Sequence, residues 1–204
     1  MSAPILRLAG TVAPLLIDSI DTDQIMPKQF LKRIERSGFG PYVFHEWRHG
    51  GDFVLDTVEH RDATILLAGS DFGCGSSREQ AVWGLLDAGI LAVLATSFAP
   101  IFVQNSLRSR LLLIPIAKAP LERLAAAARE QPATHLEIDL AAGLISYQDQ
   151  RITFPLSREE TEVFINGTDY IERTLTYESN IRAHESQRET WMPTTGSLRT
   201  PEAT

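Results

Sequence analysis

The first two-thirds of the chain alternates between short apolar runs and longer amphipathic stretches. The apolar runs are too short for buried helices and are typical of buried strands, whereas the amphipathic stretches repeat with a helical period. The runs lie at 65–68, 90–95 and 111–114, and the helical patterns lie at 79–88, 99–106 and 120–130. Residues 5–17 indicate one or two further strands. Strands that alternate with helices predict an α/β layer.

The segments on either side of this alternation follow weaker patterns. Pro27 at a first helical position favours a short helix over 27–34, and residues 38–52 indicate a loop rich in aromatic side chains. After residue 130, the alternation of apolar and polar residues predicts three shorter strands. These strands cover residues 136–140, 144–147 and 151–154.

The last part of the chain combines one helix signal with a tail. Ser157 followed by Glu160 has the spacing of a capping box, which predicts a helix over 158–166. Residues 188–204 have neither a helical nor a strand period and are rich in Thr, Pro, Ser and Gly. We therefore expect residues 1–187 to form one domain and residues 188–204 to be a mobile tail.

The loop at residues 71–79, Asp-Phe-Gly-Cys-Gly-Ser-Ser-Arg-Glu, joins a predicted strand to a predicted helix. Gly73 and Gly75 allow the backbone to turn tightly and to approach a ligand. The helix start offers unpaired N–H groups and a partial positive charge, and residues 76–78 add two hydroxyls and a cation. The loop therefore suits a carboxylate or a phosphate. A plain structural interpretation, in which one of the serines caps the helix, stays open on these local grounds.

The Gly-Ser-Ser-Arg-Glu part of this loop resembles the signature of the small, swivelling domain of the aconitase family. Three further blocks resemble the small subunits of bacterial 3-isopropylmalate dehydratases. They are residues 21–31, Asp-Thr-Asp-Gln-Ile-Met-Pro-Lys-Gln-Phe-Leu; residues 37–40 with the aromatic stretch 44–47; and residues 96–102 with Asn105 and Ser106. The matching blocks run from about residue 9 to residue 116. The resemblance implies an α/β fold, a single β/β/α swivelling domain of the aconitase type.

The chain departs from the family pattern at three places near the loop. Gln80 stands where the family usually has His, Val82 where a proline is common, and Leu113 where the usual Asn-Gly-Leu-Leu-Pro region has its proline. These departures leave two alternatives open. One is a related dehydratase that acts on a methylated malate of the citramalate or dimethylmalate type, and the other is a non-catalytic, carboxylate-binding swivel domain.

The resemblance implies a hydro-lyase that interconverts 2-isopropylmalate and 3-isopropylmalate in leucine biosynthesis. By carry-over from the family, Ser76 is the catalytic base, acting as an alkoxide that loop N–H groups, the helix start and Arg78 would stabilise. Ser77 and Arg78 would hold a substrate carboxylate. A further segment would recognise the side chain that distinguishes one malate from another. Its residues are Lys28, Gln29, Phe30 and Leu31.

Asp21 and Asp23 can be interpreted in two ways. At positions i and i+2 of an extended segment, their carboxylates would face the same side and could serve a site. They could equally be turn and cap residues ahead of Pro27. Because this segment borders the substrate in the family, the resemblance adds Asp21 and Thr22 to the expected substrate-binding residues.

Composition narrows the class of protein. The net charge is 19 − 26 = −7, which disfavours nucleic acid as a partner. The sequence has no run of about 18 uncharged apolar residues, so we expect no membrane span. The apolar stretch 8–17 lacks the flanking residues of a signal peptide and is better interpreted as a strand. We therefore expect a cytoplasmic protein.

Cys74 is the only cysteine in the chain. An iron–sulfur cluster normally takes three or four cysteine ligands, and the five histidines lack metal-ligand spacing. We therefore expect no metal or cofactor on this chain, and we expect Cys74 to be a small packed residue. Since the resemblance implies a [4Fe–4S] cluster as Lewis acid, it also implies a large, cluster-binding partner subunit.

Overall fold

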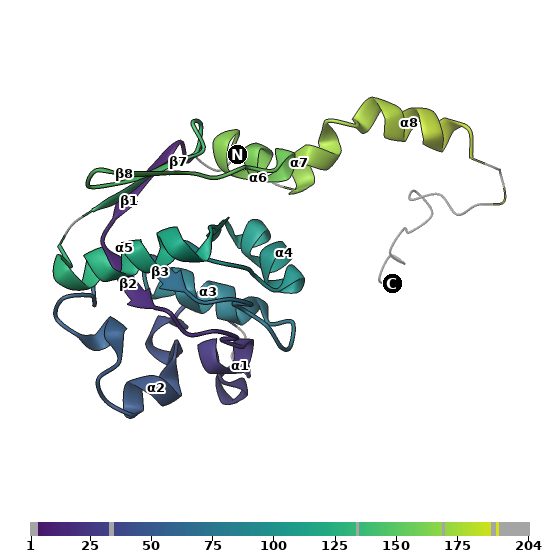
Figure 1. Ribbon diagram of the computed structural model, residues 1–204. Coiled ribbons are helices and arrows are strands. Elements are labelled where there is room, and N and C mark those ends of the chain that lie inside the picture. The colour runs from purple at the N-terminus through teal and green to yellow at the C-terminus, as the bar shows by residue number, and fades with distance from the viewer. Residues whose placement is uncertain (1–3, 33–34, 134, 169, 189–190, 192–204) are drawn as a thin grey trace.

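The computed structural model describes residues 4–32, 35–133, 135–168, 170–188 and 191. Two four-stranded sheets organise these residues in layers (Figure 1). The parallel sheet has the order β2-β3-β4-β5, with β2 (Val12–Leu15), β3 (Ile65–Ala68), β4 (Ala92–Ala95) and β5 (Leu112–Pro115). The antiparallel sheet has the order β1-β6-β7-β8, with β1 (Arg7–Gly10), β6 (Leu136–Asp139), β7 (Leu144–Tyr147) and β8 (Gln150–Thr153).

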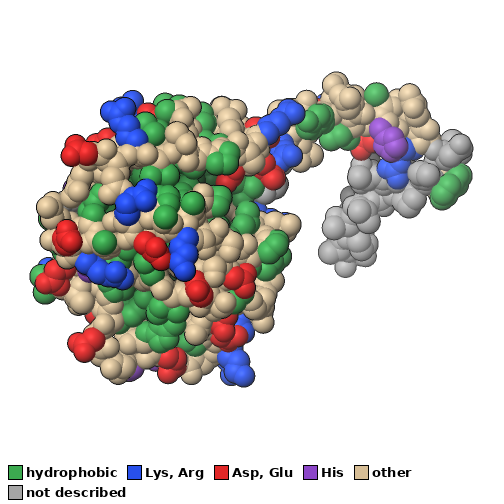
Figure 2. All heavy atoms as spheres, viewed as in Figure 1, with side chains coloured by type: hydrophobic (Ala, Val, Ile, Leu, Met, Phe, Trp, Pro, Cys, Tyr) green, Lys and Arg blue, Asp and Glu red, His purple; other side chains and the backbone are tan. Residues whose placement is uncertain are grey.

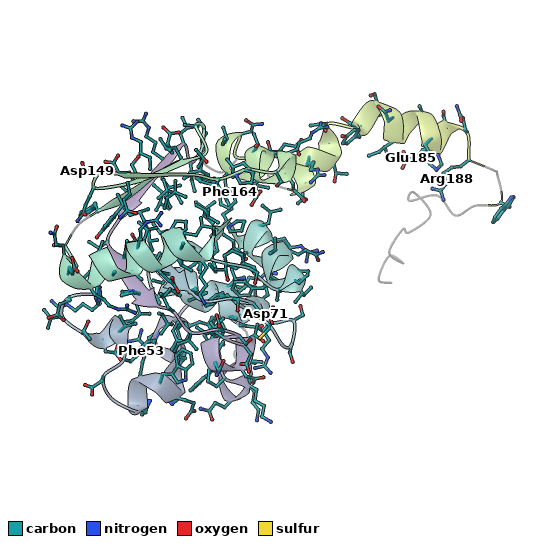
Figure 3. All side chains as sticks on the ribbon, in the orientation of Figure 1. Phe53, Asp71, Asp149, Phe164, Glu185 and Arg188 are labelled. Carbon is teal, nitrogen blue, oxygen red and sulfur yellow. The ribbon has the colours of Figure 1, made fainter. Side chains whose placement is uncertain are left out.

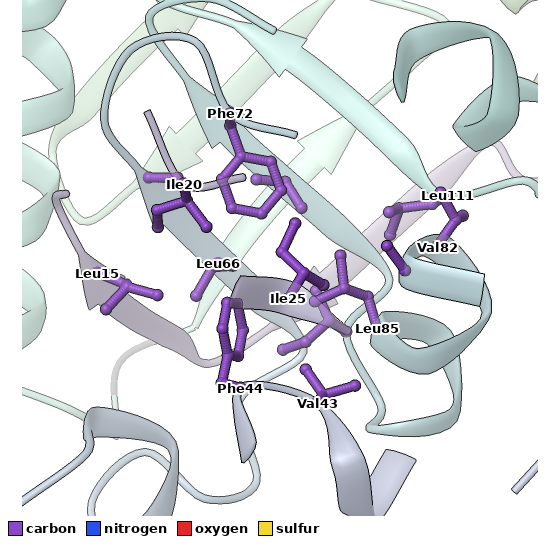
Figure 4. Packing of buried hydrophobic residues seen from close by; sticks show 14 of the residues in the cluster. Leu15, Ile20, Ile25, Val43, Phe44, Leu66, Phe72, Val82, Leu85 and Leu111 are labelled. Carbon is purple, nitrogen blue, oxygen red and sulfur yellow. The ribbon is translucent and has the colours of Figure 1, made fainter. Parts of the chain in front are cut away.

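Alternate residues of each parallel strand enter two different cores, because successive side chains of a strand point to opposite faces. In β3, Leu66 and Ala68 belong to the first core, whereas Ile65 and Leu67 belong to the second. The first core packs helices and turns against one face of the sheet (Figure 4). These elements are α1 (Thr22–Ile25), η1 (Lys28–Phe30), η2 (Gly40–Tyr42), α2 (His45–His49), η3 (Val54–Asp56), α3 (Glu79–Asp87) and α4 (Pro100–Ser109).

The second core lies between the two sheets and is filled by α5 (Lys118–Glu130) (Figure 1). The buried residues of α5 are Leu121, Leu124, Ala125 and Ala128. This i, i+3, i+4, i+7 spacing places them on one face of the helix. The antiparallel strands meet them with one face only, as in β6, where Leu136 and Ile138 are buried and Glu137 is exposed.

The C-terminal elements leave the body of the molecule. The short helix α6 (Arg158–Glu160) continues into a π-helical turn, η4 (Thr161–Ile165), and is followed by α7 (Tyr170–Leu175) and α8 (Glu178–Ser186). Figures 1 and 2 show α8 standing away from the sheets, and it contains no buried residue. On the face of the body in Figure 2, acidic and basic side chains are interspersed. No helix within the described ranges combines the length and the apolar character that crossing a membrane requires.

The chain passes from one sheet to the other through a single residue. β1 ends at Gly10 and β2 begins at Val12. A Cβ atom at Gly10 would lie 1.8 Å from the Thr64 hydroxyl oxygen, next to β3. Glycine therefore leaves room for the Thr64 hydroxyl where the chain crosses from the antiparallel to the parallel sheet, and any side chain at residue 10 would displace it.

Most of the predicted elements are confirmed, and the differences lie in segments with weak periodicity. The predicted helix over 27–34 is only one 3₁₀ turn, η1, and the predicted loop over 38–52 contains η2 and α2. The capping box of Ser157 and Glu160 is present, but the helix over 158–166 changes to a π turn after α6. The sequence pattern does not predict helices α7 and α8. The expected mobile tail at 188–204 lies outside the described residues except for two positions, Arg188 and Trp191.

Candidate functional site

The loop that follows β3 extends the parallel sheet beyond its strands. The Asp71 N–H donates to the Ser97 hydroxyl at 2.8 Å, and the Phe72 N–H donates to the Ser97 carbonyl at 3.1 Å. On its other side, the Gly73 N–H donates to the carbonyl of Ile20 at 2.8 Å. Figure 3 shows Asp71 at the level of the parallel sheet, with Phe164 in the antiparallel layer. The loop therefore lies at the carboxyl ends of the parallel strands, where open α/β sheets bind ligands.

Both loop glycines have the left-handed backbone that the sequence predicts. Gly73 has φ +79°, and a Cβ atom there would lie 2.2 Å from the ring of Phe102. Gly75 has φ +86°, and the nearest atom that a Cβ there would meet is the Asp21 Cβ at 3.5 Å. At Gly75 the backbone angle rather than crowding therefore requires glycine. These two turns bring residues 76–78 to the start of α3.

Neither serine caps α3. Arg78 occupies the N-cap position with an extended backbone, and no side chain makes a capping hydrogen bond there. The plain structural interpretation of Ser76 or Ser77 as an N-cap is therefore wrong. Both serines are exposed, and the Ser77 hydroxyl accepts a long hydrogen bond of 3.4 Å from the Asn105 side chain. Within the described residues, the Ser76 hydroxyl has no hydrogen-bond partner.

Arg78 is held by Asp23, a pairing that the sequence alone does not indicate. The two guanidinium terminal nitrogens contact the two carboxylate oxygens of Asp23, one of them at 2.6 Å, and Nη1 also donates to the Met26 carbonyl at 3.2 Å. The arginine side chain is only 12% exposed, whereas Asp23 is half exposed. Of the five guanidinium N–H donors, these bonds leave the parallel pair on Nε and Nη2. That edge can grip a second carboxylate side-on.

Of the two interpretations of Asp21 and Asp23, the cap is confirmed for Asp21 and the extended acidic pair is wrong. Asp21 is the N-cap of α1 and forms a capping box with Gln24, and Asp23 lies within α1. Thr22 is buried, its N–H donates to the Cys74 carbonyl at 2.9 Å, and its hydroxyl donates to the Ser76 carbonyl at 2.7 Å. Thr22 thus fixes the position of the loop backbone next to Ser76.

The four residues 28–31 lie just beyond the segment that holds Arg78. Lys28 and Gln29 are exposed, whereas Phe30 and Leu31 are half-buried and pack against the first core. The Phe30 ring stacks on that of Tyr42, with centroids 4.3 Å apart. The two apolar residues are therefore anchors of this turn, and the two polar residues are its open face.

Cys74 is packed into the loop as expected. Its thiol lies 3.5 Å from the Ser19 carbonyl. Burial, together with the carboxylates of Asp71 and Asp21, raises the pKa of the Cys74 thiol above its ordinary value. The thiol is therefore a weak nucleophile at neutral pH. In the part of the chain that the structure describes, no three His, Cys, Asp or Glu side chains gather as a metal site.

A second carboxylate supports the entrance to the loop. Asp18 accepts a hydrogen bond of 2.6 Å from the Ser70 N–H, which lowers the pKa of the Asp18 carboxyl below its ordinary value. Asp18 and Ser70 also line a cavity of about 230 Å³ at the carboxyl end of the sheet, as do Lys118 and Glu122 of α5. Sequence reasoning missed Asp18, because nothing local connects it to Ser70.

The three departures from the family pattern do not share one environment. Val82 is fully buried in α3, and Leu113 is buried in β5. Both residues belong to the first core. Gln80 is half-buried in the first turn of α3. Two of the three departures therefore change core packing, and only Gln80 lies close to residues 76–78 along the chain.

Comparison with known proteins decides the family. The sequence model of the aconitase C-terminal domain matches residues 2–119. The 3-isopropylmalate dehydratase small subunit of Rubrobacter xylanophilus is 41% identical over 190 residues, which cover 93% of this chain and 97% of that protein. That of Parafrankia sp. is 44% identical over 186 residues, covering 91% of this chain and 95% of the relative. The chain belongs to the family of 3-isopropylmalate dehydratase small subunits.

A solved member of the family has the same fold. The crystal structure of the 3-isopropylmalate dehydratase (leuD) of Methanocaldococcus jannaschii aligns with a TM-score of 0.61 and 26% identity, covering 88% of this chain and 99% of that one. The aconitase-type α/β fold inferred from the sequence motifs is thus confirmed, as is the family that those motifs indicated.

Proposed function

We propose that this chain is the small subunit of a two-subunit 3-isopropylmalate dehydratase, which interconverts 2-isopropylmalate and 3-isopropylmalate by loss and return of water in leucine biosynthesis. Membership of the family supports this reaction. Among the residues, the environment of Ser76 is the observation that supports this reaction most directly. Its hydroxyl is exposed and caps no helix, on a loop whose backbone is held from both sides.

Ser76 is the catalytic base in this proposal and removes the carbon-bound proton beside a substrate carboxylate. A serine hydroxyl is far too weak an acid to be an alkoxide without help. The positive end of α3 and the guanidinium of Arg78 supply that help, because both place positive potential at the end of the loop. The same environment favours a dicarboxylate over a neutral substrate.

Arg78 and Ser77 hold one substrate carboxylate. The Nε–Nη2 edge of Arg78 offers two parallel donors while Asp23 fixes the opposite end of the guanidinium. The Ser77 hydroxyl, oriented by Asn105, offers a third donor. Residues 21, 22 and 28–31 border the rest of the substrate. Of these, 28–31 select its alkyl group.

The dehydration also needs a Lewis acid that accepts hydroxide. In the family this is a [4Fe–4S] cluster, and one packed cysteine with a raised pKa does not fit as the ligand set of such a cluster. We therefore place the cluster on a large partner subunit. The net charge of −7 argues against a nucleic-acid partner, and we place the enzyme in the cytoplasm.

Reconstitution tests the proposal. The purified chain should show neither the brown absorbance of an iron–sulfur cluster nor dehydratase activity, and co-expression with the large subunit should give both. The complex should then be assayed against a panel of alkyl-malates. A chain that carries a cluster and turns over substrate alone contradicts the two-subunit assignment. Preference for citramalate or dimethylmalate over isopropylmalate identifies the alternative dehydratase, and binding without turnover identifies the non-catalytic domain.

A further inference from the structure

The turn at residues 28–31 has few contacts of its own. Its backbone makes two short-range hydrogen bonds, from the Phe30 N–H to the Pro27 carbonyl at 3.0 Å and from the Leu31 N–H to the Lys28 carbonyl at 3.1 Å. No side chain caps it. A single 3₁₀ turn of this kind is not stable by itself, so its position depends on what its two anchors, Phe30 and Leu31, pack against.

Two rings on the following segment hold Phe30. Tyr42 stacks on it nearly face to face, with centroids 4.3 Å apart and planes at 20°. His45 meets it edge-on at 4.8 Å and 72°. We call this pair, Tyr42 and His45, the ring clamp. Stacked and edge-to-face geometries are the two that aromatic rings prefer, so the clamp fixes both the place and the tilt of the Phe30 ring.

An unusual backbone residue lies between the two clamp residues. Phe44 has φ +55°, a left-handed conformation that is rare for a bulky side chain. It is fully buried, it stacks on Trp47 at 5.2 Å, and its N–H donates to the Ile25 carbonyl at 2.9 Å. The surrounding core therefore imposes this conformation. Phe44 is also the N-cap of α2, so its left-handed backbone sets the start of the helix whose first residue, His45, contacts the same ring as Tyr42.

We propose that Tyr42 and His45 are positioning residues for substrate selectivity, acting through Phe30 on the open face formed by Lys28 and Gln29. The proposal rests on the proposed function of residues 28–31. It assigns the discrimination between alkyl groups to the position of this turn rather than to direct contact of Phe30 with substrate. One methylene of pocket contact changes relative rates by about 10- to 200-fold, and a displaced turn loses that discrimination.

The test uses the complete two-subunit enzyme and compares Tyr42→Leu with Tyr42→Phe. Tyr42→Leu removes the ring that stacks on Phe30. Tyr42→Phe is the matched control, because it keeps the ring and removes only the hydroxyl. His45→Leu provides a second, independent removal of a clamp ring. Each variant is assayed for kcat/KM with isopropylmalate and with an unbranched malate, and for hydrogen exchange at the Phe30 and Leu31 amides.

We expect Tyr42→Leu and His45→Leu to lower the ratio of the two kcat/KM values and to speed exchange at both amides. Loss of one aromatic pair should change this ratio by up to about tenfold. Tyr42→Phe should keep the wild-type ratio and exchange rates. An unchanged ratio in both Tyr42→Leu and His45→Leu, or an equal loss in Tyr42→Phe, overturns the proposal. If the wild-type complex does not convert isopropylmalate at all, the proposed function fails, and exchange at the two amides then still decides whether the clamp positions the turn.

Discussion

Two neighbouring parts of the candidate site are held in different ways. The loop at 71–78 is fixed mainly through its backbone on both sides: its N–H groups donate to Ser97 and to the Ile20 carbonyl, and the Cys74 carbonyl accepts from the Thr22 N–H. The turn at 28–31 is held mainly by side-chain packing of Phe30 and Leu31. Backbone hydrogen bonds depend little on side-chain identity, whereas ring packing changes with every substitution. The reacting groups therefore sit on the rigid part, and the groups that we propose to select the substrate sit on the part that substitutions can adjust.

The largest effect should come from the rigid part. Ser76→Ala should lower kcat by about 10²- to 10⁴-fold, the range of a general base, with an unchanged melting temperature because Ser76 caps no helix. Ser157→Ala is the control, since Ser157 does cap a helix and should cost about 0.5–2 kcal/mol of stability without loss of activity. Steady-state kinetics and thermal melts check both. If Ser76→Ala keeps more than about a tenth of kcat, a loss of only about 1.4 kcal/mol, Ser76 is not the base.

A smaller loss of kcat/KM should follow when the two-point contact between Arg78 and Asp23 is removed. Arg78→Lys keeps the charge but loses the planar fork that meets Asp23, so KM should rise and kcat/KM should fall by about 10- to 100-fold, the value of a charged hydrogen bond. Asp23→Asn leaves Arg78 in place without its partner charge and should change kcat/KM in the same direction by less. An unchanged KM in Arg78→Lys would show that Arg78 does not bind the substrate carboxylate.

Substitutions in the turn at 28–31 should change substrate selectivity more than they change kcat. Replacing Phe30 and Leu31 together by serine removes both anchors of the turn. It should therefore reduce kcat/KM for isopropylmalate about tenfold more than for unbranched malates, within the range of about 1–3 kcal/mol that one methylene of pocket contact is worth. Lys32→Ala, at an exposed position just after the turn, is the comparison and should leave both kcat/KM values unchanged. Measuring both substrates with each variant separates the two effects. Equal losses for all substrates would mean that the turn has only a structural role.

The smallest expected effect is a change in stability at Asp18, whose carboxylate binds the Ser70 N–H just before the loop. Because the Ser70 N–H lowers the pKa of Asp18 in the folded state, the ionised carboxylate stabilises the fold above its unfolded pKa of about 3.9. That contribution disappears as the pH falls through the folded pKa. Asp18→Asn should therefore lower the melting temperature slightly at pH 7, and the gap to the wild type should close below about pH 4. A gap that stays constant down to acid pH would show that the Asp18 charge is not responsible.

The sequence predicts the features whose cause is local. Strand positions follow from apolar runs, and the need for Gly73 and Gly75 follows from the turn that separates β3 from α3. The spacing of Asp21 and Gln24 also carries a local signal, since it is that of a capping box. The two aspartates alone, without Gln24, do not decide between this cap and an extended acidic pair.

Features that join distant parts of the chain could not be predicted in this way. The partner of Arg78 is Asp23, 55 positions away, and either neighbouring aspartate could have served from sequence alone. The contact of His45 with Phe30 follows the left-handed residue Phe44, for which the sequence contains no glycine signal. These contacts arise from packing of the first core, which imposes backbone conformations that local preference does not favour.

The passage from β1 to β2 at Gly10 sets an order of assembly during translation. All four parallel strands are present once the chain has been made as far as Pro115. β1 precedes them but pairs with β6, and Arg7 and its ion-pair partner Asp139 are 132 positions apart. At about 5–20 residues per second, β1 waits on the order of ten seconds for its partner strand, and the parallel sheet is complete only for roughly the last few seconds of that time. Until β6 is made, β1 is an unpaired strand, and unpaired strand edges are sites of aggregation that a chaperone can cover.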